Sequence, residues 1–373
     1  MAPSKLFQLI TVGEMSLQHR VVGAPLTRFR ASSTHVPNPV MCDYYEQRSH
    51  TPGTLLIGEA TIIAAKAGGW VHIPGIWNQE QIDAWKSITH RVHAKGCYIF
   101  CQLWAFGRAA YPEVLAAEDP SFPYIAPSDI PLTGQKVIPR PMTVEEIQDY
   151  VQLYAEAAQN AIKAGFDGVE IHGANGYLLD QFTQNVSNRR SDQYGGNIMN
   201  RVRFPLQVVD AVVNAVGANK TGYRLSPWNS FQDMAMKDPK LTFTYLVSQI
   251  KEKYPDFAYI HVVEPRIVGT SDRNLDDIDA HEENDFLREI WAPKPVISAG
   301  GYDQATATRV ADEKNDLIAF GRHFLANPDL VCRLKNNIPL NPYDRETFYI
   351  GGNVAKGYTD YPFAAEANAK AAL

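Results

Sequence analysis

Short apolar runs alternate with longer amphipathic runs along almost the whole chain, and this alternation constrains the fold more than any other feature of the sequence. Eight runs have the length and composition of buried strands; they cover residues 20–24, 54–59, 98–103, 168–172, 222–225, 259–263, 295–299 and 317–320. Eight stretches with helical periodicity lie between and after them, at residues 39–48, 79–94, 144–164, 200–216, 242–254, 283–291, 303–312 and 327–336. Eight strand–helix units that close on themselves form a (β/α)8 (TIM) barrel, an α/β fold, and the pattern predicts one such domain over residues 1–373.

Two of the helical stretches open with clear start signals. Thr143 stands three residues before Glu146, which is the spacing of a capping box. The run Asn327-Pro328-Asp329 combines a capping side chain with a proline suited to the first helical turn. Helices are therefore expected to begin at these points.

Two long connections depart from a minimal barrel. Residues 104–141 separate the third strand from its helix, and a connection of that length over the carboxyl ends of the strands predicts a lid or capping insertion. Residues 264–282 are strongly polar and are expected to be mobile. Either connection can also be a tolerated surface insertion. The alanine-rich residues 364–373 are expected to form a frayed tail.

Composition narrows the classes of function. The chain is 45% hydrophobic and 20% charged, which allows a large buried core. Its net charge of -6 and the lack of a Lys/Arg block argue against a nucleic-acid partner. No apolar run has the length of a signal or membrane segment, so the cytoplasm is the expected compartment. The four cysteines form no CxxC pair and no metal-ligand spacing, so reduced thiols and no metal are expected.

The fourth apolar run ends in three side chains of distinct chemistry. Residues 169–171 are followed by His172, Asn175 and Tyr177, an imidazole, an amide and a phenol. The carboxyl ends of barrel strands are where catalysis takes place. His172 and Asn175 can donate hydrogen bonds to one substrate oxygen, while Tyr177 can give up a proton, so the pattern indicates charge developing on an oxygen and protonation of a nearby carbon. Taken alone, so short a pattern fits a helix-capping turn with a buried histidine equally well.

The seventh and eighth apolar runs end in residues suited to binding phosphate. Barrels commonly bind phosphate at the loops that follow these two strands. Glycines leave backbone N–H groups free to donate, and an arginine supplies a permanent forked cation. The residues concerned are Gly300, Gly301, Gly321 and Arg322.

The other strand ends suit the ring system of a flavin. The chain has no GxGxxG opening a βαβ unit and no P-loop, so a phosphorylated cofactor must lie across the barrel mouth. Gln102 can pair with a pyrimidine-type edge, Arg224 can stabilise an electron-rich ring, and Thr27 can bond a ring carbonyl. The candidate residues at these strand ends are Pro25, Leu26, Thr27, Ala60, Gln102 and Arg224.

Taken together, these motifs resemble the Old Yellow Enzyme family of flavin-dependent ene-reductases over almost the whole chain. The resemblance is strongest to the fungal and yeast-type branch, which includes reductases of ergot-alkaloid pathways. The motifs that carry it are 24–30 (APLTRFR), 101–104 (CQLW), 172–179 (HGANGYLL), 188–196 (NRRSDQYGG), 224–227 (RLSP), and 321–324 (GRHF) with 327–330 (NPDL).

The resemblance implies tightly bound, non-covalent FMN, NADPH as the reductant, and an α,β-unsaturated carbonyl substrate such as an enone, an enal, a maleimide or a nitroalkene. In it, Tyr177 is the proton donor, while His172 and Asn175 polarise the substrate carbonyl. The residues implied to bind FMN are Pro25, Leu26, Thr27, Ala60, Gln102, His172, Asn175, Arg224, Gly300, Gly301, Gly321 and Arg322. The candidate walls of the substrate pocket are Trp70, Trp104, Phe231, Phe348 and Tyr349. A monomer and a homodimer are both compatible with the sequence.

Some features separate this chain from neighbouring branches. Thr27 stands where some relatives have a cysteine, and the cysteine cluster of iron–sulfur relatives is absent. Tyr177 stands where an isomerase variant lacks the tyrosine, which favours net reduction. Met199 replaces an acidic residue in the run GGSxENR, and we expect this to alter an ion pair rather than catalysis. Two other functions stay open: an FMN-dependent isomerase or tailoring oxidoreductase of a secondary-metabolite pathway, and a non-catalytic flavin-binding barrel.

Overall fold

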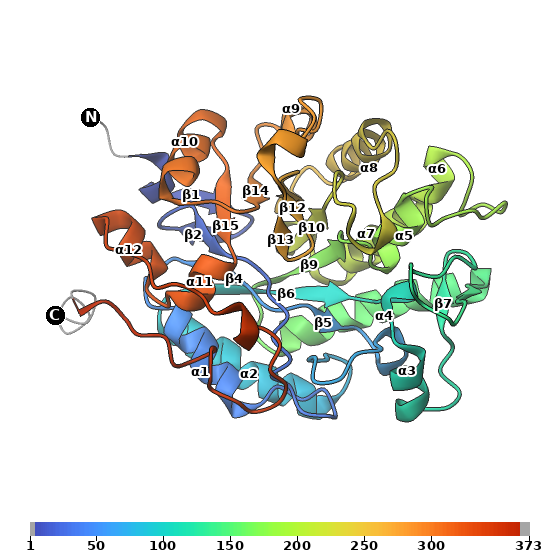
Figure 1. Ribbon diagram of the computed structural model, residues 1–373, viewed down its shortest axis with the longest axis horizontal. Coiled ribbons are helices and arrows are strands. Elements are labelled where there is room, and N and C mark those ends of the chain that lie inside the picture. Colours follow the sequence, from blue (N-terminus) through green and yellow to red (C-terminus); the bar gives the residue numbers. More distant parts are fainter. Residues whose placement is uncertain (1–3, 366–373) are drawn as a thin grey trace.

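Eight parallel strands close into a barrel in the computed structural model, which describes residues 4–365 (Figure 1). In order around the barrel they are β3 (Val21–Gly23), β4 (Leu55–Ile57), β6 (Tyr98–Trp104), β9 (Gly168–Gly173), β10 (Thr221–Leu225), β11 (Tyr259–Val263), β14 (Val296–Ala299) and β15 (Leu317–Phe320). Each strand pairs in parallel with the next, and β15 pairs with β3, so the sheet has no free edge. The short strand β5 (Thr61–Ile62) adds to β6. The predicted (β/α)8 barrel is confirmed.

Helices surround this barrel on the outside. The longer ones are α1 (Pro39–Arg48), α2 (Gln79–Ala94), α4 (Val144–Lys163), α7 (Arg203–Val216), α8 (Lys240–Lys253), α9 (Asp285–Trp291), α10 (Gln304–Lys314) and α12 (Leu330–Asn336). The remaining α-helices of the described chain are α3 (Pro112–Glu118), which has the same length as α9 and α12, and the shorter α5 (Leu178–Thr183), α6 (Ile198–Arg201) and α11 (Arg322–Ala326). The expected helix at 200–216 is interrupted at Val202, because Pro205 has no N–H to continue the hydrogen-bond ladder.

One predicted helix start is confirmed and the other is displaced. Thr143 caps α4 in a reciprocal capping box: its hydroxyl accepts from the Glu146 N–H at 3.1 Å, and the Glu146 carboxylate accepts from the Thr143 N–H at 2.8 Å. The helix expected from residue 327 begins only at Leu330. The Asn327 side-chain oxygen accepts from the Asn341 N–H at 2.7 Å instead, so it is not available as a cap.

The barrel interior has its own apolar core, separate from the one under the helices. Phe100 and Tyr259 fill its middle, and a Cβ on Gly168 or Gly222 would lie 2.4 Å from one of these rings. Glycine at both positions is therefore a requirement of packing rather than of backbone conformation. The hairpin of β1 (Ile10–Val12) and β2 (Met15–Leu17) packs its apolar side chains against the same interior core.

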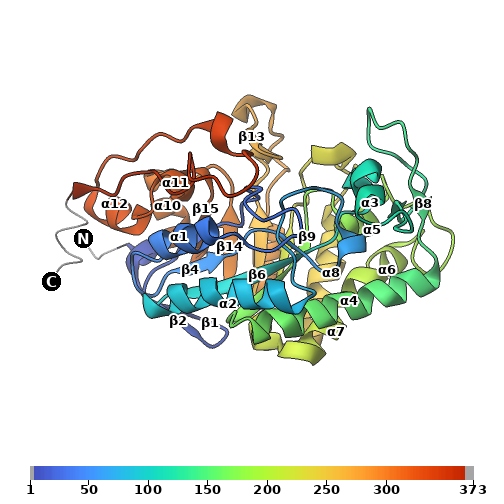
Figure 2. The ribbon, with the colours of Figure 1, turned by 90° about the horizontal axis from the view of Figure 1, so that it is seen from below.

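Two segments extend the barrel beyond the carboxyl ends of its strands. The connection between β6 and α4 contains η3 (Gly107–Ala109), α3, β7 (Ile125–Ala126) and β8 (Arg140–Pro141), and Figures 1 and 2 show it beyond the end toward which β6 points. The connection between β11 and α9 forms a hairpin of β12 (Ile267–Val268) and β13 (Ser271–Asp272), followed by η6 (Leu275–Asp277). No local sequence pattern indicated this hairpin, and the mobility expected there stays a prediction.

Three buried arginines tie the C-terminal segment to the barrel. They donate to backbone carbonyls: Arg28 Nε to Phe348 at 2.9 Å, Arg30 Nε to Val354 at 2.8 Å and Arg48 Nη2 to Tyr358 at 3.0 Å. The segment (red in Figure 1) is thereby held with Phe348 and Tyr349 at the barrel mouth. Of the tail expected at 364–373, residues 366–373 lie outside the described part of the chain.

Within residues 4–365, no helix is long and apolar enough to span a membrane, and no cluster of potential metal ligands occurs. Cys42, Cys97, Cys101 and Cys332 are free thiols.

Candidate active site

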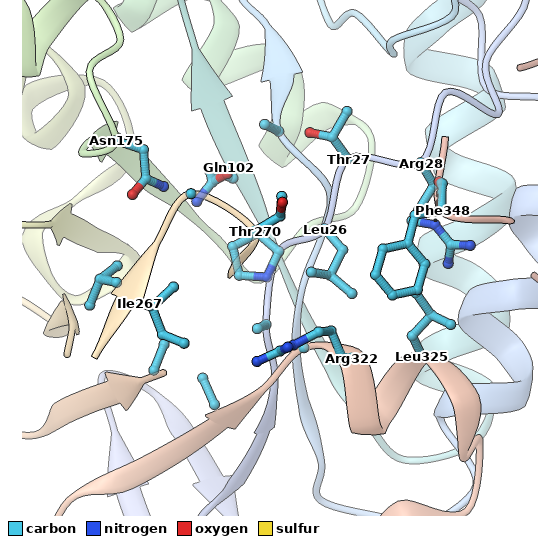
Figure 3. A pocket seen from close by; sticks show the side chains of 18 of the residues that line it. Leu26, Thr27, Arg28, Gln102, Asn175, Ile267, Thr270, Arg322, Leu325 and Phe348 are labelled. Atoms are coloured by element: carbon cyan, nitrogen blue, oxygen red, sulfur yellow. Dashed lines mark hydrogen bonds between the residues drawn. The ribbon is translucent and has the colours of Figure 1, made fainter. Parts of the chain in front are cut away.

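A cavity of about 850 Å³ opens at the carboxyl ends of the barrel strands. Figure 3 shows side chains from separate strand ends around it, with Asn175 and Arg322 on different sides. Every site residue predicted from the sequence lines this cavity: Pro25, Leu26, Thr27, Ala60, Trp70, Gln102, Trp104, His172, Asn175, Tyr177, Arg224, Phe231, Gly300, Gly301, Gly321, Arg322, Phe348 and Tyr349. The structure therefore brings the candidate residues together, and their individual roles stay predictions.

His172 presents a hydrogen-bond donor to the cavity. Its Nδ1 accepts the Ala174 N–H at 3.3 Å, which places the ring proton of the neutral form on Nε2. Burial, assisted by the charge of Arg224, lowers the pKa of His172 well below its ordinary value. The imidazole is thus neutral at physiological pH, with Nε2–H free to donate.

Asn175 is oriented so that its amide nitrogen is the free atom. Its backbone has φ 56°, in the left-handed region that asparagine tolerates. Its N–H donates to the Ser226 hydroxyl at 2.7 Å, and its Oδ1 accepts from the Asn229 amide at 2.9 Å. The Nδ2 group remains as a second donor beside His172.

Tyr177 lies against the aromatic wall of the same cavity. Its ring meets Trp104 edge-on at a centroid distance of 4.7 Å and His172 at 5.2 Å. Burial raises the pKa of Tyr177, although a hydrogen bond with the Gln232 side chain opposes this. The phenol is therefore protonated at physiological pH and can serve as a proton donor.

The phosphate end of the cavity is built from two loops. Gly300 and Gly301 have φ values of 142° and 61°, which favour glycine. Arg322 donates to the Asp272 carboxylate at 2.6 Å, and Arg345 lies 3.8 Å from the same carboxylate. This glycine-and-arginine cradle has the donors that a phosphate needs, and a phosphate bound here would compete with Asp272 for Arg322.

The ring end of the cavity offers one acceptor and one strong donor. Gln102 uses its amide nitrogen on Glu170, at 2.6 Å, which leaves the amide oxygen for a ligand. The Nε of Arg224 is buried without a partner in the described part of the chain, so a ligand is needed to satisfy this guanidinium. An acceptor for a ring N–H next to a donor for ring oxygen or nitrogen fits the pyrimidine portion of a flavin.

Sequence reasoning missed several neighbours of the site. Glu170 and His261 form a buried pair, with 2.8 Å between Oε2 and Nδ1, directly behind Gln102. A carboxylate and an imidazole within otherwise apolar strands are a sequence signal from which a buried polar pair could have been predicted. Ile267 and Asp272 line the cavity from the β12–β13 hairpin, and no local sequence feature predicts that they lie there.

Comparison with known proteins decides which family this site belongs to. The sequence model of the NADH:flavin oxidoreductase / NADH oxidase family matches residues 5–341. The chain belongs to this family. The predicted membership of the Old Yellow Enzyme family, near the reductases of ergot-alkaloid pathways, is thereby confirmed.

Curated relatives match this family member over nearly its whole length. Chanoclavine-I aldehyde reductase fgaOx3 of Penicillium roqueforti is 50% identical over 368 residues, covering 97% of each chain. NADP-dependent oxidoreductase lnbE of Aspergillus flavus is 46% identical over 372 residues, covering 98% of this chain and 97% of the relative. A protein of Claviceps fusiformis named probable inactive dehydrogenase easA is 44% identical over 374 residues, covering 98% of this chain and 96% of the relative.

Among solved structures, morphinone reductase superposes with a TM-score of 0.87 and 37% identity, covering 97% of this chain and 96% of that one. The two chains thus share one fold over nearly their whole length.

Proposed function

We propose that this flavin oxidoreductase binds FMN and reduces the activated C=C bond of α,β-unsaturated carbonyl compounds, with NADPH as the reductant. The observation that carries the proposal is the arrangement of His172, Asn175 and Tyr177. Two oriented neutral donors share one cavity with a protonated phenol. Such a set suits a reaction in which an oxygen gains negative charge while a carbon receives a proton.

The two donors hold the substrate carbonyl. His172 Nε2–H and Asn175 Nδ2–H are fixed by contacts made on their other atoms, to Ala174 and Asn229. They are therefore oriented before the substrate arrives, and no reorganisation is needed as charge develops on the oxygen. A preorganised donor of this kind contributes about 3–4 kcal/mol to a transition state that carries an oxyanion.

Tyr177 supplies the proton. Its hydroxyl is held at the cavity by the ring contacts with Trp104 and His172. Because its pKa is raised, the acidic form is populated throughout the physiological range. The turn that carries it is fixed by the Asp180 carboxylate, which accepts from the Gly176 N–H at 2.9 Å.

FMN, when bound, supplies the hydride chemistry that no side chain can perform. The residues proposed to hold its ring are Pro25, Leu26, Thr27, Ala60, Gln102, His172, Asn175 and Arg224, and those proposed to hold its phosphate are Gly300, Gly301, Gly321 and Arg322. NADPH is favoured over NADH because one relative is named NADP-dependent.

An anaerobic absorbance titration tests the proposal. Purified protein is titrated with NADPH, and in parallel with NADH, and cyclohexenone is then added. The expected result is bleaching of a flavin band by NADPH and its return with the enone. A protein that stays colourless after reconstitution with FMN would overturn the cofactor assignment. Bleaching without return would retain the flavin and reject the enone as the oxidant. Bleaching by NADH alone would overturn the choice of NADPH, and a coloured protein that neither nucleotide bleaches would indicate a non-catalytic barrel.

A further inference from the structure

Glu170 is a buried carboxylate that the proposed mechanism does not use. It lies on β9, two residues before His172, and its side chain is 0% exposed in the barrel interior. It does not line the cavity, so it cannot contact a ligand there. An ionised group placed in a barrel core is costly unless neighbouring groups compensate it, so its partners show what it does.

One oxygen of Glu170 fixes the orientation of Gln102. The two residues face each other across the β6–β9 pair, and Gln102 Nε2 donates to Glu170 Oε1 at 2.6 Å. A carboxylate only accepts hydrogen bonds, so it binds the nitrogen end of the amide and turns the oxygen end toward the cavity. The other oxygen is occupied by His261 Nδ1 at 2.8 Å. Both oxygens are thus used inside the barrel.

Glu170 also balances the charge of Arg224. The guanidinium has no ion pair within residues 4–365; burial lowers its pKa, and the charge of Glu170 opposes this most strongly. Burial favours the neutral acid of Glu170, but the hydrogen bonds from His261 and Gln102 and the positive charge of Arg224 favour the carboxylate. Burial lowers the pKa of His261, so the imidazole contributes a neutral N–H. One positive and one negative charge remain beneath the ring end of the cavity.

We propose that Glu170 is a positioning residue with two separate roles: its charge offsets that of Arg224 and so sets the redox potential of the bound flavin, and its hydrogen bond orients the Gln102 amide that holds the flavin ring. The inference rests on the proposed binding of FMN. Reduced flavin is richer in electrons than oxidised flavin, so an uncompensated Arg224 favours the reduced form. Glu170 therefore keeps the potential lower than Arg224 alone would set it.

The test is the midpoint potential of bound FMN in Glu170→Gln, measured by anaerobic dye-coupled reduction without any enone. The variant keeps the side-chain shape and removes the charge. We expect at least a tenfold gain in affinity for reduced over oxidised FMN, which for a two-electron couple is a shift of about 30 mV to more positive values.

Asp316→Asn is the matched control. Asp316 is a buried carboxylate whose Oδ2 lies 2.8 Å from Arg288, just before the amino end of β15 and outside the cavity. Its neutralisation should destabilise the fold in a similar way without moving the potential. If the midpoint potential of bound FMN is unchanged in Glu170→Gln, as it is expected to be in the control, the proposal is wrong.

Glu170→Asp separates the two roles and serves where Glu170→Gln does not fold. This substitution retains the negative charge, but the side chain is one methylene shorter, so the carboxylate lies farther from the Gln102 amide. The expected result is a potential close to that of the wild type with a several-fold higher dissociation constant for FMN. An unchanged dissociation constant would overturn the orienting role, and a shifted potential would overturn the charge role. A colourless wild type would overturn FMN binding itself and this inference with it, whereas unchanged potentials in a yellow protein overturn this inference alone.

Discussion

Replacing Tyr177 with phenylalanine removes one hydroxyl and leaves the aromatic wall in place. The ring keeps its edge-on contacts with Trp104 and His172, so the phenylalanine should occupy the same position. The substitution removes only the hydroxyl, and the loss of a single hydrogen bond costs about 0.5–1.5 kcal/mol of folding free energy. The fold should therefore survive, and any loss of activity reports on chemistry.

The expected loss follows from the role of a general acid. Side chains in that role contribute about 10²- to 10⁴-fold, or roughly 3–5 kcal/mol of transition-state stabilisation. Stopped-flow absorbance separates the two halves of the cycle. Bleaching by NADPH should keep nearly its wild-type rate in Tyr177→Phe, while re-oxidation by cyclohexenone should slow by about 10²-fold or more. Re-oxidation by ferricyanide, which needs no protonation of carbon, should be unaffected.

Tyr154→Phe is the control for this experiment. Tyr154 lies on α4, outside the cavity, and its buried hydroxyl has no hydrogen-bond partner in residues 4–365. Its removal should leave both half-reactions unchanged. The proton-donor role of Tyr177 is refuted if Tyr177→Phe re-oxidises with enone at the wild-type rate, or if its bleaching by NADPH collapses together with re-oxidation.

Three further outcomes are expected. Arg322→Ala removes the cation of the phosphate cradle, so the purified protein should carry less FMN by absorbance; full occupancy would contradict the phosphate assignment. His172→Ala removes one of two oxygen donors, and the dissociation constant of a phenol ligand should rise about tenfold in a spectral titration, since one hydrogen bond contributes about 1 kcal/mol or more; unchanged binding would exclude His172 from the oxygen site. Burial raises the pKa of Glu59 to about 7, so the fold favours its protonated form, and this contribution is present below the unfolded pKa and lost as pH rises toward 7. Urea unfolding should therefore show Glu59→Gln gaining stability relative to the wild type between about pH 5 and 8, and a constant difference would count against the raised pKa.

The strand ends could be predicted because each carries its own signal. Gln102, His172 and Arg224 are polar residues at or near the ends of apolar runs, and a parallel barrel brings all such ends to one mouth. The order of the strands follows from the chain, so no long-range contact had to be guessed. The same reasoning placed Gly300 and Arg322 at one end of the cavity.

The rest depends on contacts between segments far apart in the sequence. Asp272 was expected in a mobile loop, but Arg322, fifty positions later, binds its carboxylate at the cavity. The helix expected at Asn327 begins later because the oxygen of that side chain accepts from the distant Asn341 N–H. Glu170 was treated as part of an apolar run, since its partners lie on neighbouring strands. The periodicity of a sequence predicts which face of a helix or strand a residue occupies. It does not predict which side chain from another segment will contact that residue.

The three arginines that bind the C-terminal segment have a consequence for the order of synthesis. A nascent chain that has been translated only through β15 holds every strand of the barrel and still lacks Phe348 and Tyr349 of the pocket wall. Until that segment has been made, Arg28, Arg30 and Arg48 lack the carbonyl acceptors that it supplies. The segment that follows the last barrel strand therefore completes both the burial of these charges and the wall of the pocket, so the full site forms only after this segment has been made.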